Sequence, residues 1–364
     1  MPSELYIGLM SGTSVDGVDA VLADFGATPC RILGRSHIAF AGALRAELND
    51  LQQSGTDELH RAALAANALM DCCALAVTAL IADADLRAAD IAAVGLHGQT
   101  VRHRPELEFT IQLANPARLA EACRIAVVAD FRSRDVAAGG QGAPLAPGLH
   151  AALFRDRAVH RVVVNIGGIA NITDLPPTGA VRGFDTGPGN TLLDAWCLRH
   201  RGEAFDRGGA WAASGRPIDA LLARLRSEAY FALPPPKSTG RDRFNLAWLE
   251  AQVESSYVPQ DVQRTLLALT ATTIADAIAR YCGGASEVLA CGGGAHNAAL
   301  LHEVEARLGE RSLATTAARG VAVNDVEALA FAWLARETLA GRPGNLPAVT
   351  GARGPRVLGA VYPA

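Results

Sequence analysis

The segment from residue 7 to residue 20 gathers side chains that suit the binding of phosphate. Glycines and hydroxyl residues lie here between two apolar runs, together with two carboxylates. In a tight turn, backbone N–H groups and hydroxyls can point at an anion, while Asp16 or Asp19 reaches a phosphate-bound Mg²⁺. The residues that we expect to hold the phosphates are Ser11, Gly12, Thr13, Ser14, Asp16, Gly17 and Asp19.

This segment matches neither of two common phosphate-binding motifs. No Gly-Lys-Ser/Thr follows it, as a P-loop would require, and the Gly-x-Gly-x-x-Gly spacing of dinucleotide-binding proteins is missing. The apolar runs predict strands at 6–10 and 18–22, and we expect Gly12 and Gly17 to permit the turn by adopting positive φ angles. The alternative is a polar hairpin turn that binds nothing.

A further carboxylate, Asp185, is placed to do chemistry. It is predicted to end a strand, and the glycine-rich residues 186–190 lead from it into a helix. An aspartate beside glycines and a helix N-terminus can bind Mg²⁺ or take up a proton as a general base. The structural alternative is an aspartate that caps the turn through its own backbone, which is common before Thr-Gly.

Two other glycine clusters follow strand-like runs. Gly167 and Gly168 interrupt segment 161–175, which repeats the strand, glycine turn and strand of the first segment. Three consecutive glycines at 292–294 are unfavourable in chain entropy unless a ligand or another backbone comes close. We expect Gly292, Gly293 and Gly294 to contact the adenosine or the α-phosphate of a nucleotide. For the triple glycine, the alternative is a close packing turn between helix and strand.

Three single residues carry groups that suit the binding of a ligand in a cleft. His97 lies between glycines at the end of an apolar run and can bind sugar hydroxyls or an acetamido carbonyl. Arg132 follows another strand and can clamp a carboxylate or a phosphate, and Glu327 lies in the first turn of a predicted helix. Each has a structural alternative. His97 could be a hydrogen-bonded core histidine, Arg132 could form a surface salt bridge, and Glu327 could provide a favourable charge at the helix dipole.

Alternating strands and helices must position these residues. Strand-like runs end in glycine or polar turns at 5–10, 18–25, 91–96, 125–129, 161–166 and 287–291, and a short strand is expected at 357–361. Apolar residues recur with a period near 3.6 at 43–53, 57–84, 190–201, 218–227, 262–281 and 298–308. The alternation predicts an α/β fold.

The length of 364 residues predicts two domains with a ligand cleft between them, because a single hydrophobic core stops growing below this size. We expect an N-terminal domain over 1–135 and a C-terminal domain over 136–364, with a C-terminal tail that can pack back on the first domain. The boundary is expected near 130–148, where the sequence lacks periodicity. The shared plan of 6–25 and 161–175 suggests two related halves.

Composition excludes several classes of protein. Half of the residues are apolar and the net charge is −4, which argues against a nucleic-acid-binding face. Seven cysteines without a Cys-x-x-Cys pair favour neither a disulfide framework nor a zinc site, and they predict reduced thiols in the cytoplasm. No secretory signal is recognised, and the alanine-rich stretch 62–82, interrupted by Asn67 and Asp71, suits a core helix better than a membrane span.

Taken together, these motifs resemble the actin, Hsp70 and sugar-kinase superfamily, in which two ribonuclease-H-like domains close on ATP. The narrower resemblance is to the anhydro-N-acetylmuramic acid kinase family, and it spans nearly the whole chain. The motifs that carry it are residues 8–19, 97–100, 165–173, 185–190 and 327–328. Gly8 stands where the superfamily usually has a first-strand aspartate, so the metal falls to Asp16, Asp19 or Asp185, and we assign it to Asp16.

The resemblance implies an ATP- and Mg²⁺-dependent enzyme of cell-wall recycling. Such an enzyme opens 1,6-anhydro-N-acetylmuramic acid with water and phosphorylates O6, giving N-acetylmuramic acid 6-phosphate and ADP. By this analogy Asp185 takes a proton from the water, and Gly167 and Gly168 form a second phosphate contact. His97, Arg132 and Glu327 line the sugar, with Arg132 on its lactyl carboxylate. The resemblance also implies a homodimer.

Two other functions stay open on the sequence. The first is a phosphotransferase of the same superfamily that acts on another sugar, on acetate or on polyphosphate. The second is an actin-like or chaperone-like nucleotide switch, which would hydrolyse ATP slowly without a small substrate.

Overall fold

The computed structural model describes residues 4–12 and 14–364, so Thr13, one of the expected phosphate ligands, lies outside the described residues. The chain divides into two compact units. Unit 1 is formed by Met1–Leu153 together with Asp325–Ala364, and unit 2 by Phe154–Asn324. This division differs from the expected one at residue 135, since unit 1 also takes in residues 136–153 and the whole C-terminal segment.

A buried aspartate explains why the expected boundary region stays inside unit 1. Asp135 is fully buried, and its Oδ1 accepts hydrogen bonds from Asn345 Nδ2 at 2.7 Å and Thr350 Oγ1 at 2.8 Å. Its Oδ2 accepts from the backbone N of Gly142 at 2.8 Å. A buried carboxylate requires such partners, and these come from both the glycine-rich stretch and the C-terminal segment.

The sheet of unit 1 has the strand order β13-β7-β4-β1-β2-β3. β1, β2 and β3 form an antiparallel meander, β4 and β7 continue parallel to β1, and β13 closes the edge antiparallel to β7. Its strands are β1 (Leu5–Met10), β2 (Gly17–Asp24), β3 (Arg31–Ala39), β4 (Ala93–Leu96), β7 (Val127–Ala129) and β13 (Ala360–Tyr362). A separate hairpin pairs β5 (Gln99–Arg104) with β6 (Phe109–Leu113).

The sheet of unit 2 has the order β10-β9-β8-β11-β12. Its strands are β8 (Arg161–Ile166), β9 (Ile169–Leu175), β10 (Arg182–Pro188), β11 (Glu287–Cys291) and β12 (Ser312–Thr315). β8, β9 and β10 are antiparallel neighbours, and β8, β11 and β12 are parallel. Apart from β13, unit 1 has the same order and directions, so the α/β prediction of two ribonuclease-H-like halves is confirmed.

The helices of each unit cover its sheet. In unit 1 they are α1 (Gly42–Asp50), α2 (Glu58–Asp83), η1 (Ala88–Asp90), η2 (Pro105–Leu107), α3 (Pro116–Cys123), α4 (Ser133–Ala137), α13 (Asp325–Leu339) and α14 (Pro347–Thr350), and α5 (Ala146–Phe154) ends at the first residue of unit 2. In unit 2 they are α6 (Thr191–Arg201), η3 (Arg207–Gly209), α7 (Ala210–Ala213), α8 (Asp219–Arg226), α9 (Ala229–Ala232), α10 (Leu246–Glu250), α11 (Pro259–Tyr281), η4 (Gly293–His296), α12 (Ala298–Glu305) and η5 (Thr316–Arg319).

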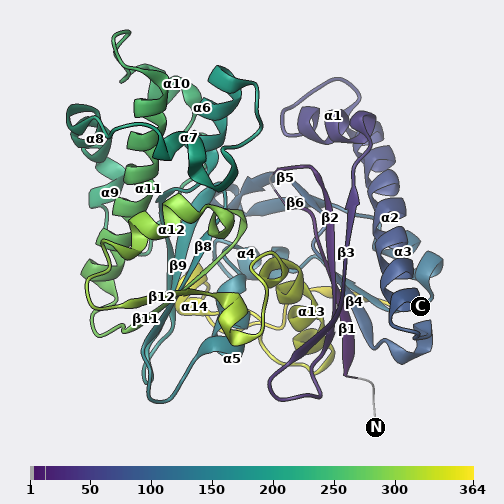
Figure 1. Ribbon diagram of the computed structural model, residues 1–364. Coiled ribbons are helices and arrows are strands. Elements are labelled where there is room, and N and C mark those ends of the chain that lie inside the picture. Colours follow the sequence, from purple (N-terminus) through teal and green to yellow (C-terminus); the bar gives the residue numbers. More distant parts are fainter. Residues whose placement is uncertain (1–3, 13) are drawn as a thin grey trace. The chain divides into compact units, whose positions relative to one another are not determined.

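Two glycines bring α13 into close contact with the sheet of unit 1. A Cβ at Gly8 would lie 1.9 Å from the carbonyl O of Ala328, and a Cβ at Gly95 would lie 1.9 Å from that of Phe331. Side chains alternate along a strand, so Ile7 faces the opposite side, where it packs in the core with α2. α2 and α13 therefore cover opposite faces of this sheet (Figure 1). The absence of the superfamily's aspartate at position 8 follows, because any side chain there would collide with α13.

The long helix α2 belongs to the core of unit 1. By length and composition alone it could cross a membrane. Its buried side chains, among them Leu69, Met70 and Leu80, pack in the core cluster with the strands β1, β2 and β4. This packing is that of a core helix in a soluble domain, as the sequence predicted.

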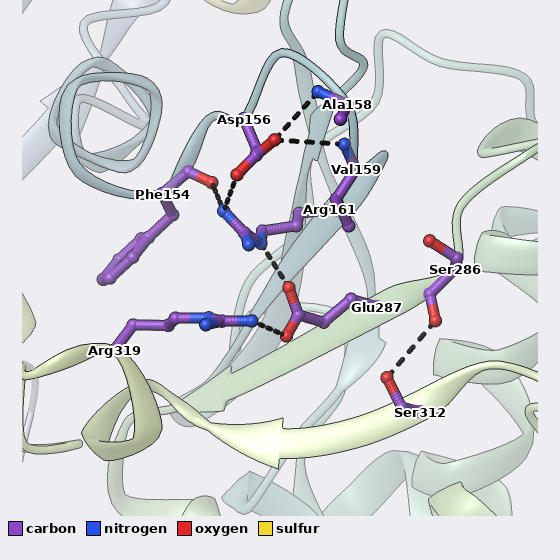
Figure 2. A network of polar contacts seen from close by, with 9 residues as sticks. All are labelled: Phe154, Asp156, Ala158, Val159, Arg161, Ser286, Glu287, Ser312 and Arg319. Atoms are coloured by element: carbon purple, nitrogen blue, oxygen red, sulfur yellow. Dashed lines mark hydrogen bonds and ion pairs between the residues drawn. The ribbon is translucent and has the colours of Figure 1, made fainter.

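An ion-pair network fixes the start of the parallel strands in unit 2 (Figure 2). The Arg161 guanidinium, at the start of β8, binds Glu287 of β11 and lies 3.3 Å from Asp156 Oδ2. Glu287 also binds Arg319 of η5. Although burial raises the pKa of Glu287, hydrogen bonds from the two arginines hold it below its usual value. The network lies at the opposite ends of β8 and β11 from the glycine turns, so it sets the strand register without occupying the candidate site.

Candidate active site

The turn between β1 and β2 in unit 1 holds a strained backbone. Among its described residues the left-handed conformation is adopted by Val15, with φ of 52°, and its side chain is buried in the core. The expected positive φ at Gly12 and Gly17 is therefore wrong. A β-branched residue in this region is strained, and such strain is found at ligand sites.

The two glycines of this turn have different roles. A Cβ at Gly17 would lie 2.5 Å from the carbonyl O of Ile38 on β3, so packing requires glycine there. At Gly12 the nearest atom to such a Cβ, Ser14 Oγ, is 3.9 Å away. Packing therefore does not require glycine at position 12, and the space beside it is open.

The two carboxylates of the turn have different surroundings. Asp16 is exposed, and its Oδ1 accepts a hydrogen bond from Ser14 Oγ at 2.8 Å. Asp19 Oδ1 lies 2.8 Å from His37 Nδ1. Within residues 4–12 and 14–364, no group of three or more His, Cys, Asp or Glu side chains could enclose a metal ion. A carboxylate such as Asp16 still fits Mg²⁺, because Mg²⁺ is commonly held by one or two carboxylates, substrate phosphates and water.

His97 connects this turn to the residues expected to bind the sugar. Its Nδ1 lies 3.2 Å from the carbonyl O of Ser11, and its Nε2 lies 3.0 Å from a terminal nitrogen of Arg132. A carbonyl can only accept and a guanidinium can only donate, so Nδ1 carries the proton and Nε2 is the acceptor. Burial, with the positive charge of Arg132, lowers the pKa of His97 to about 3, and the ring is neutral.

Gln99, the first residue of β5, forms a second connection to the turn, beside that of His97. Ser11 Oγ donates to Gln99 Oε1, and Gln99 Nε2 donates to the carbonyl O of Gly12 at 3.3 Å. Sequence reasoning placed Gln99 in the motif 97–100 as a donor to the sugar, but it predicted neither of these hydrogen bonds. The structure thus brings the expected phosphate turn, His97 and Arg132 into one hydrogen-bonded network.

Arg132 and Glu327 lie close enough to influence each other. Arg132 donates from a terminal nitrogen to the carbonyl O of Gly142 at 2.8 Å. Burial lowers the pKa of Arg132 to about 10, while the charges of Glu327 and Asp135 act in the opposite direction. Glu327 is exposed in the first turn of α13, and Phe331 of the same helix packs its ring on His97, with centroids 4.7 Å apart. Arg132 is therefore part of the site network and not a surface salt bridge.

Asp185 is held within β10, at a β-bulge, and does not end the strand as expected. Its Oδ2 accepts a hydrogen bond from the backbone N of Thr239 at 2.9 Å, and its own N donates to the carbonyl O of Lys237 at 3.1 Å. The Tyr230 hydroxyl donates to the Asp185 carbonyl at 2.8 Å. The carboxylate is thus anchored by a distant loop, and it does not cap its own turn.

Burial raises the pKa of Asp185 to about 6, although the Thr239 hydrogen bond and the charge of Lys237 lower it. At neutral pH the group is ionised and more basic than an ordinary aspartate. A general base works best with a pKa near the operating pH. Lys237, Thr239 and Tyr230 were missed as supporting residues, and the one signal for them was the irregular Pro-rich stretch before Lys237.

The glycine turn after β8 supports the start of α6. The carbonyl O of Gly167 accepts from Asn190 N at 2.8 Å, and that of Gly168 accepts from Gly189 N at 2.9 Å and Thr191 N at 3.1 Å. A Cβ at Gly189 would lie 2.3 Å from the Gly167 carbonyl O. The two expected phosphate contacts therefore lie beside the N-terminus of α6. The N–H groups of Asn190 and Thr191 are bonded to the carbonyls of these two glycines, and the helix dipole favours anions at this end.

Thr191, at the start of α6, is a residue that sequence reasoning missed. Its Oγ1 is buried and has no hydrogen-bond partner among the residues that the structure describes. A Cβ at Gly168 would lie 2.8 Å from this oxygen, so glycine leaves the hydroxyl room. An unsatisfied buried hydroxyl at a helix N-terminus is suited to donate to a ligand.

Packing explains two of the three glycines at 292–294. Gly292 has φ of 79°, and a Cβ there would lie 2.3 Å from Asn165 Oδ1. A Cβ at Gly294 would lie 2.3 Å from a side-chain carbon of Ile166. At Gly293 the nearest atom to a Cβ is 3.8 Å away, so this position alone is open to a ligand. The two glycine turns of unit 2 lie side by side.

Comparison with known proteins decides the family. The family model described as anhydro-N-acetylmuramic acid kinase matches residues 4–364. The chain belongs to this family. An anhydro-N-acetylmuramic acid kinase of Nitrosomonas europaea is 52% identical over 99% of both chains, and one of Bordetella petrii is 55% identical over 100% of this chain and 97% of the other. Membership in the anhydro-N-acetylmuramic acid kinase family makes the protein a sugar kinase, which confirms the prediction from the sequence.

A solved structure supports the fold. Component A of the (R)-2-hydroxyglutaryl-CoA dehydratase of Acidaminococcus fermentans superimposes with a TM-score of 0.50 at 16% identity, over 91% of this chain and 96% of that one. At this identity the likeness concerns the fold alone. It agrees with the two similar sheets of the anhydro-N-acetylmuramic acid kinase chain described above.

Proposed function

We propose that the protein uses ATP and water to convert 1,6-anhydro-N-acetylmuramic acid into N-acetylmuramic acid 6-phosphate and ADP, in the recycling of peptidoglycan. Family membership over the whole length supports the kinase activity and the use of ATP. The observation that carries the hydrolytic step is the buried carboxylate of Asp185, whose pKa of about 6 suits a general base at neutral pH.

The chemistry balances with one base and one water. The water oxygen bonds to the anomeric carbon, the bond from that carbon to O6 breaks, and Asp185 takes the proton of the water. O6 then bonds to the γ-phosphorus of ATP, and the bond to the β–γ bridging oxygen breaks to release ADP. Phosphoryl transfer needs positioning and charge neutralisation more than covalent help, so no enzyme nucleophile is required.

Unit 1 supplies the recognition of the sugar in this proposal. Arg132 holds the lactyl carboxylate through charge-assisted hydrogen bonds. Both ring nitrogens of His97 are already engaged by Ser11 and Arg132, so His97 acts as a positioning residue for Arg132 and not as a direct ligand. Glu327, exposed beside Arg132, accepts from a sugar hydroxyl or the acetamido N–H.

The phosphates are bound by backbone groups and hydroxyls in this proposal. Gly12 and Ser14 of the first turn, together with Gly167, Gly168 and the unsatisfied Thr191 hydroxyl, supply donors. Gly293 leaves room on the adenosine side. Asp16 would hold Mg²⁺, which neutralises charge on the phosphates when bound.

The cellular setting is also a proposal. All seven cysteines are free in the structure, which suits a reducing cytoplasm. A homodimer is proposed from the family resemblance.

A substrate panel tests the proposed function. The purified protein is incubated with ATP and Mg²⁺ and with anhydro-N-acetylmuramic acid, N-acetylmuramic acid, glucose, acetate or polyphosphate, and the release of ADP is measured. The proposal predicts release with the anhydro sugar far above all other acceptors. Equal release with another acceptor, or steady release without any acceptor, would favour the two alternatives raised by the sequence.

A further inference from the structure

Unit 2 contains a pocket to which the proposed reaction assigns no ligand, although two of its lining residues, Thr186 and Lys237, adjoin Asp185. Its volume is about 580 Å³, and it is lined by the ends of α8 and α11, by α9, by part of β10 and by Lys237. The lining residues that matter here are Arg226, Phe231, Lys237, Asp276, Arg280 and Tyr281. Among the described lining residues are none of the glycines expected to contact the nucleotide, so this pocket is separate from the glycine turns.

The charges in this pocket do not balance. Arg226 is paired with Asp276, with 2.9 Å between a terminal nitrogen and Oδ2. Within the described residues, Lys237 and Arg280 have no carboxylate at ion-pair distance. Lys237 Nζ instead lies 3.3 Å from the Tyr230 carbonyl O and 4.6 Å from the centre of the Tyr230 ring. Lys237 is offset only by the charge of Asp185, which lies beyond ion-pair distance, and Arg280 has no compensating carboxylate within the described residues.

The two unpaired cations lie near each other. Burial lowers the pKa of Lys237, and the positive charge of Arg280 lowers it further, while the charge of Asp185 acts in the opposite direction. Like charges at close range disfavour each other's charged forms, and an anion between them would relieve this. Arg280, together with the partly offset Lys237, suits an anion such as a phosphate monoester at neutral pH.

The remaining walls suit a ring attached to that anion. Phe231 and Tyr281 contribute aromatic rings, and Ala232, Ala277 and Ala279 contribute small side chains. The guanidinium of Arg280 lies 5.3 Å from the centre of the Tyr281 ring. A ligand whose anion contacts Arg280 would therefore place its own ring beside Tyr281. A pocket of this size holds a small organic molecule with a few polar anchors.

We propose that this pocket binds a phosphate monoester of a ring-sized group, such as a sugar, with Arg280 and Lys237 on the phosphate and Phe231 and Tyr281 on the ring. Arg280 can bind the phosphate with two parallel hydrogen bonds, and Lys237 acts as a point charge. The proposal does not depend on the identity of the kinase substrate. The ligand is a second one, in addition to the nucleotide and the acceptor sugar.

Calorimetry on the full chain tests this proposal, with ADP and Mg²⁺ kept saturating so that the nucleotide phosphates are occupied. Glucose 6-phosphate and phenyl phosphate are the probes, and glucose is the uncharged control. We expect both phosphates to bind and glucose not to bind. Tighter binding of glucose 6-phosphate would identify sugar phosphates as the ligand class, and tighter binding of phenyl phosphate would identify aromatic ones.

Three variants separate this pocket from any other phosphate site. Arg280→Gln should weaken binding by about tenfold or more, because it removes one of two charge-assisted contacts. Asp276→Asn should strengthen binding, because it removes the one carboxylate of the lining and frees Arg226. Arg157→Gln, an exposed arginine of unit 2 outside the pocket, is the matched control and should leave binding unchanged.

Two outcomes would overturn the proposal. The first is that neither phosphate binds to the wild-type protein. The second is that Arg280→Gln and Arg157→Gln bind the probes with equal affinity. If Arg280→Gln fails to fold by circular dichroism, Asp276→Asn decides, because unchanged or weaker binding in that variant contradicts the assignment.

Discussion

His97 Nε2 accepts a hydrogen bond from the guanidinium of Arg132, at 3.0 Å from one terminal nitrogen. The other ring nitrogen faces the carbonyl of Ser11, so a neutral histidine links the turn after β1 to the arginine expected to bind the sugar carboxylate. The residue that the sequence suggested as a sugar ligand therefore acts through Arg132.

The first prediction concerns this link. His97→Ala should raise the KM for the anhydro sugar, because Arg132 loses its acceptor inside the site. Leaving a buried partner unsatisfied costs about 1–3 kcal/mol, or roughly 5- to 150-fold. His97→Gln keeps an acceptor and should lose less, and the exposed His302→Gln is the control. Steady-state kinetics with both substrates would refute the link if His97→Ala kept the wild-type KM for the sugar.

The second prediction concerns the general base. Asp185→Asn should lower kcat by about 10²–10⁴-fold while the affinity for ADP stays unchanged. Asp194, a carboxyl of α6 in unit 2, is the matched control, because burial also raises its pKa to about 6. Asp194→Asn should stay near the wild-type rate. Equal losses of kcat in the two variants would contradict the assignment of Asp185.

The third prediction concerns pH. A base works in its ionised form, so kcat should fall with decreasing pH through the Asp185 pKa of about 6. The charge of Lys237 lowers this pKa, so Lys237→Met should move the acid limb to higher pH. Rate profiles of the two proteins from pH 4.5 to 8.5 give the test. An acid limb that moves to lower pH in the variant would be inconsistent with this account.

The fourth prediction separates packing glycines from a ligand glycine. Gly95→Ala should destabilise unit 1 by about 1–3 kcal/mol or more, because the new Cβ would collide with the backbone of α13 at Phe331. Gly12→Val should leave the unfolding temperature nearly unchanged and weaken ATP binding, because the space at Gly12 is open. Thermal unfolding and calorimetry measure the two effects. ATP affinity unaltered in Gly12→Val would argue against phosphate binding at this turn.

Local patterns in the sequence predicted much of the fold. The apolar runs at 5–10 and 161–166 coincide with β1 and β8, and the helix expected over 57–84 coincides with α2. β3 was missed because its half-exposed, alternating residues include glycine, serine and arginine, which disguise a strand. The β5–β6 hairpin was also missed, because no strong turn signal separates its two strands in the sequence.

Contacts between residues far apart in the chain could not be predicted from the sequence. The return of α13 to the sheet of unit 1 depends on Gly8 and Gly95, which lie far from Asp325 in the chain. The support of Asp185 by Thr239 joins residues more than fifty positions apart. The positive φ of Val15 could not be foreseen either, because glycines nearby are the usual candidates for that conformation.

The most direct test of the hydrolytic mechanism follows the oxygen of the water. The protein is incubated with ATP, Mg²⁺ and 1,6-anhydro-N-acetylmuramic acid in ¹⁸O-labelled water, and the sugar phosphate is analysed by mass spectrometry before anomeric exchange. The account predicts one ¹⁸O atom on the anomeric carbon and none in the transferred phosphoryl group. Label in the phosphoryl group, or an unlabelled anomeric oxygen, would contradict it.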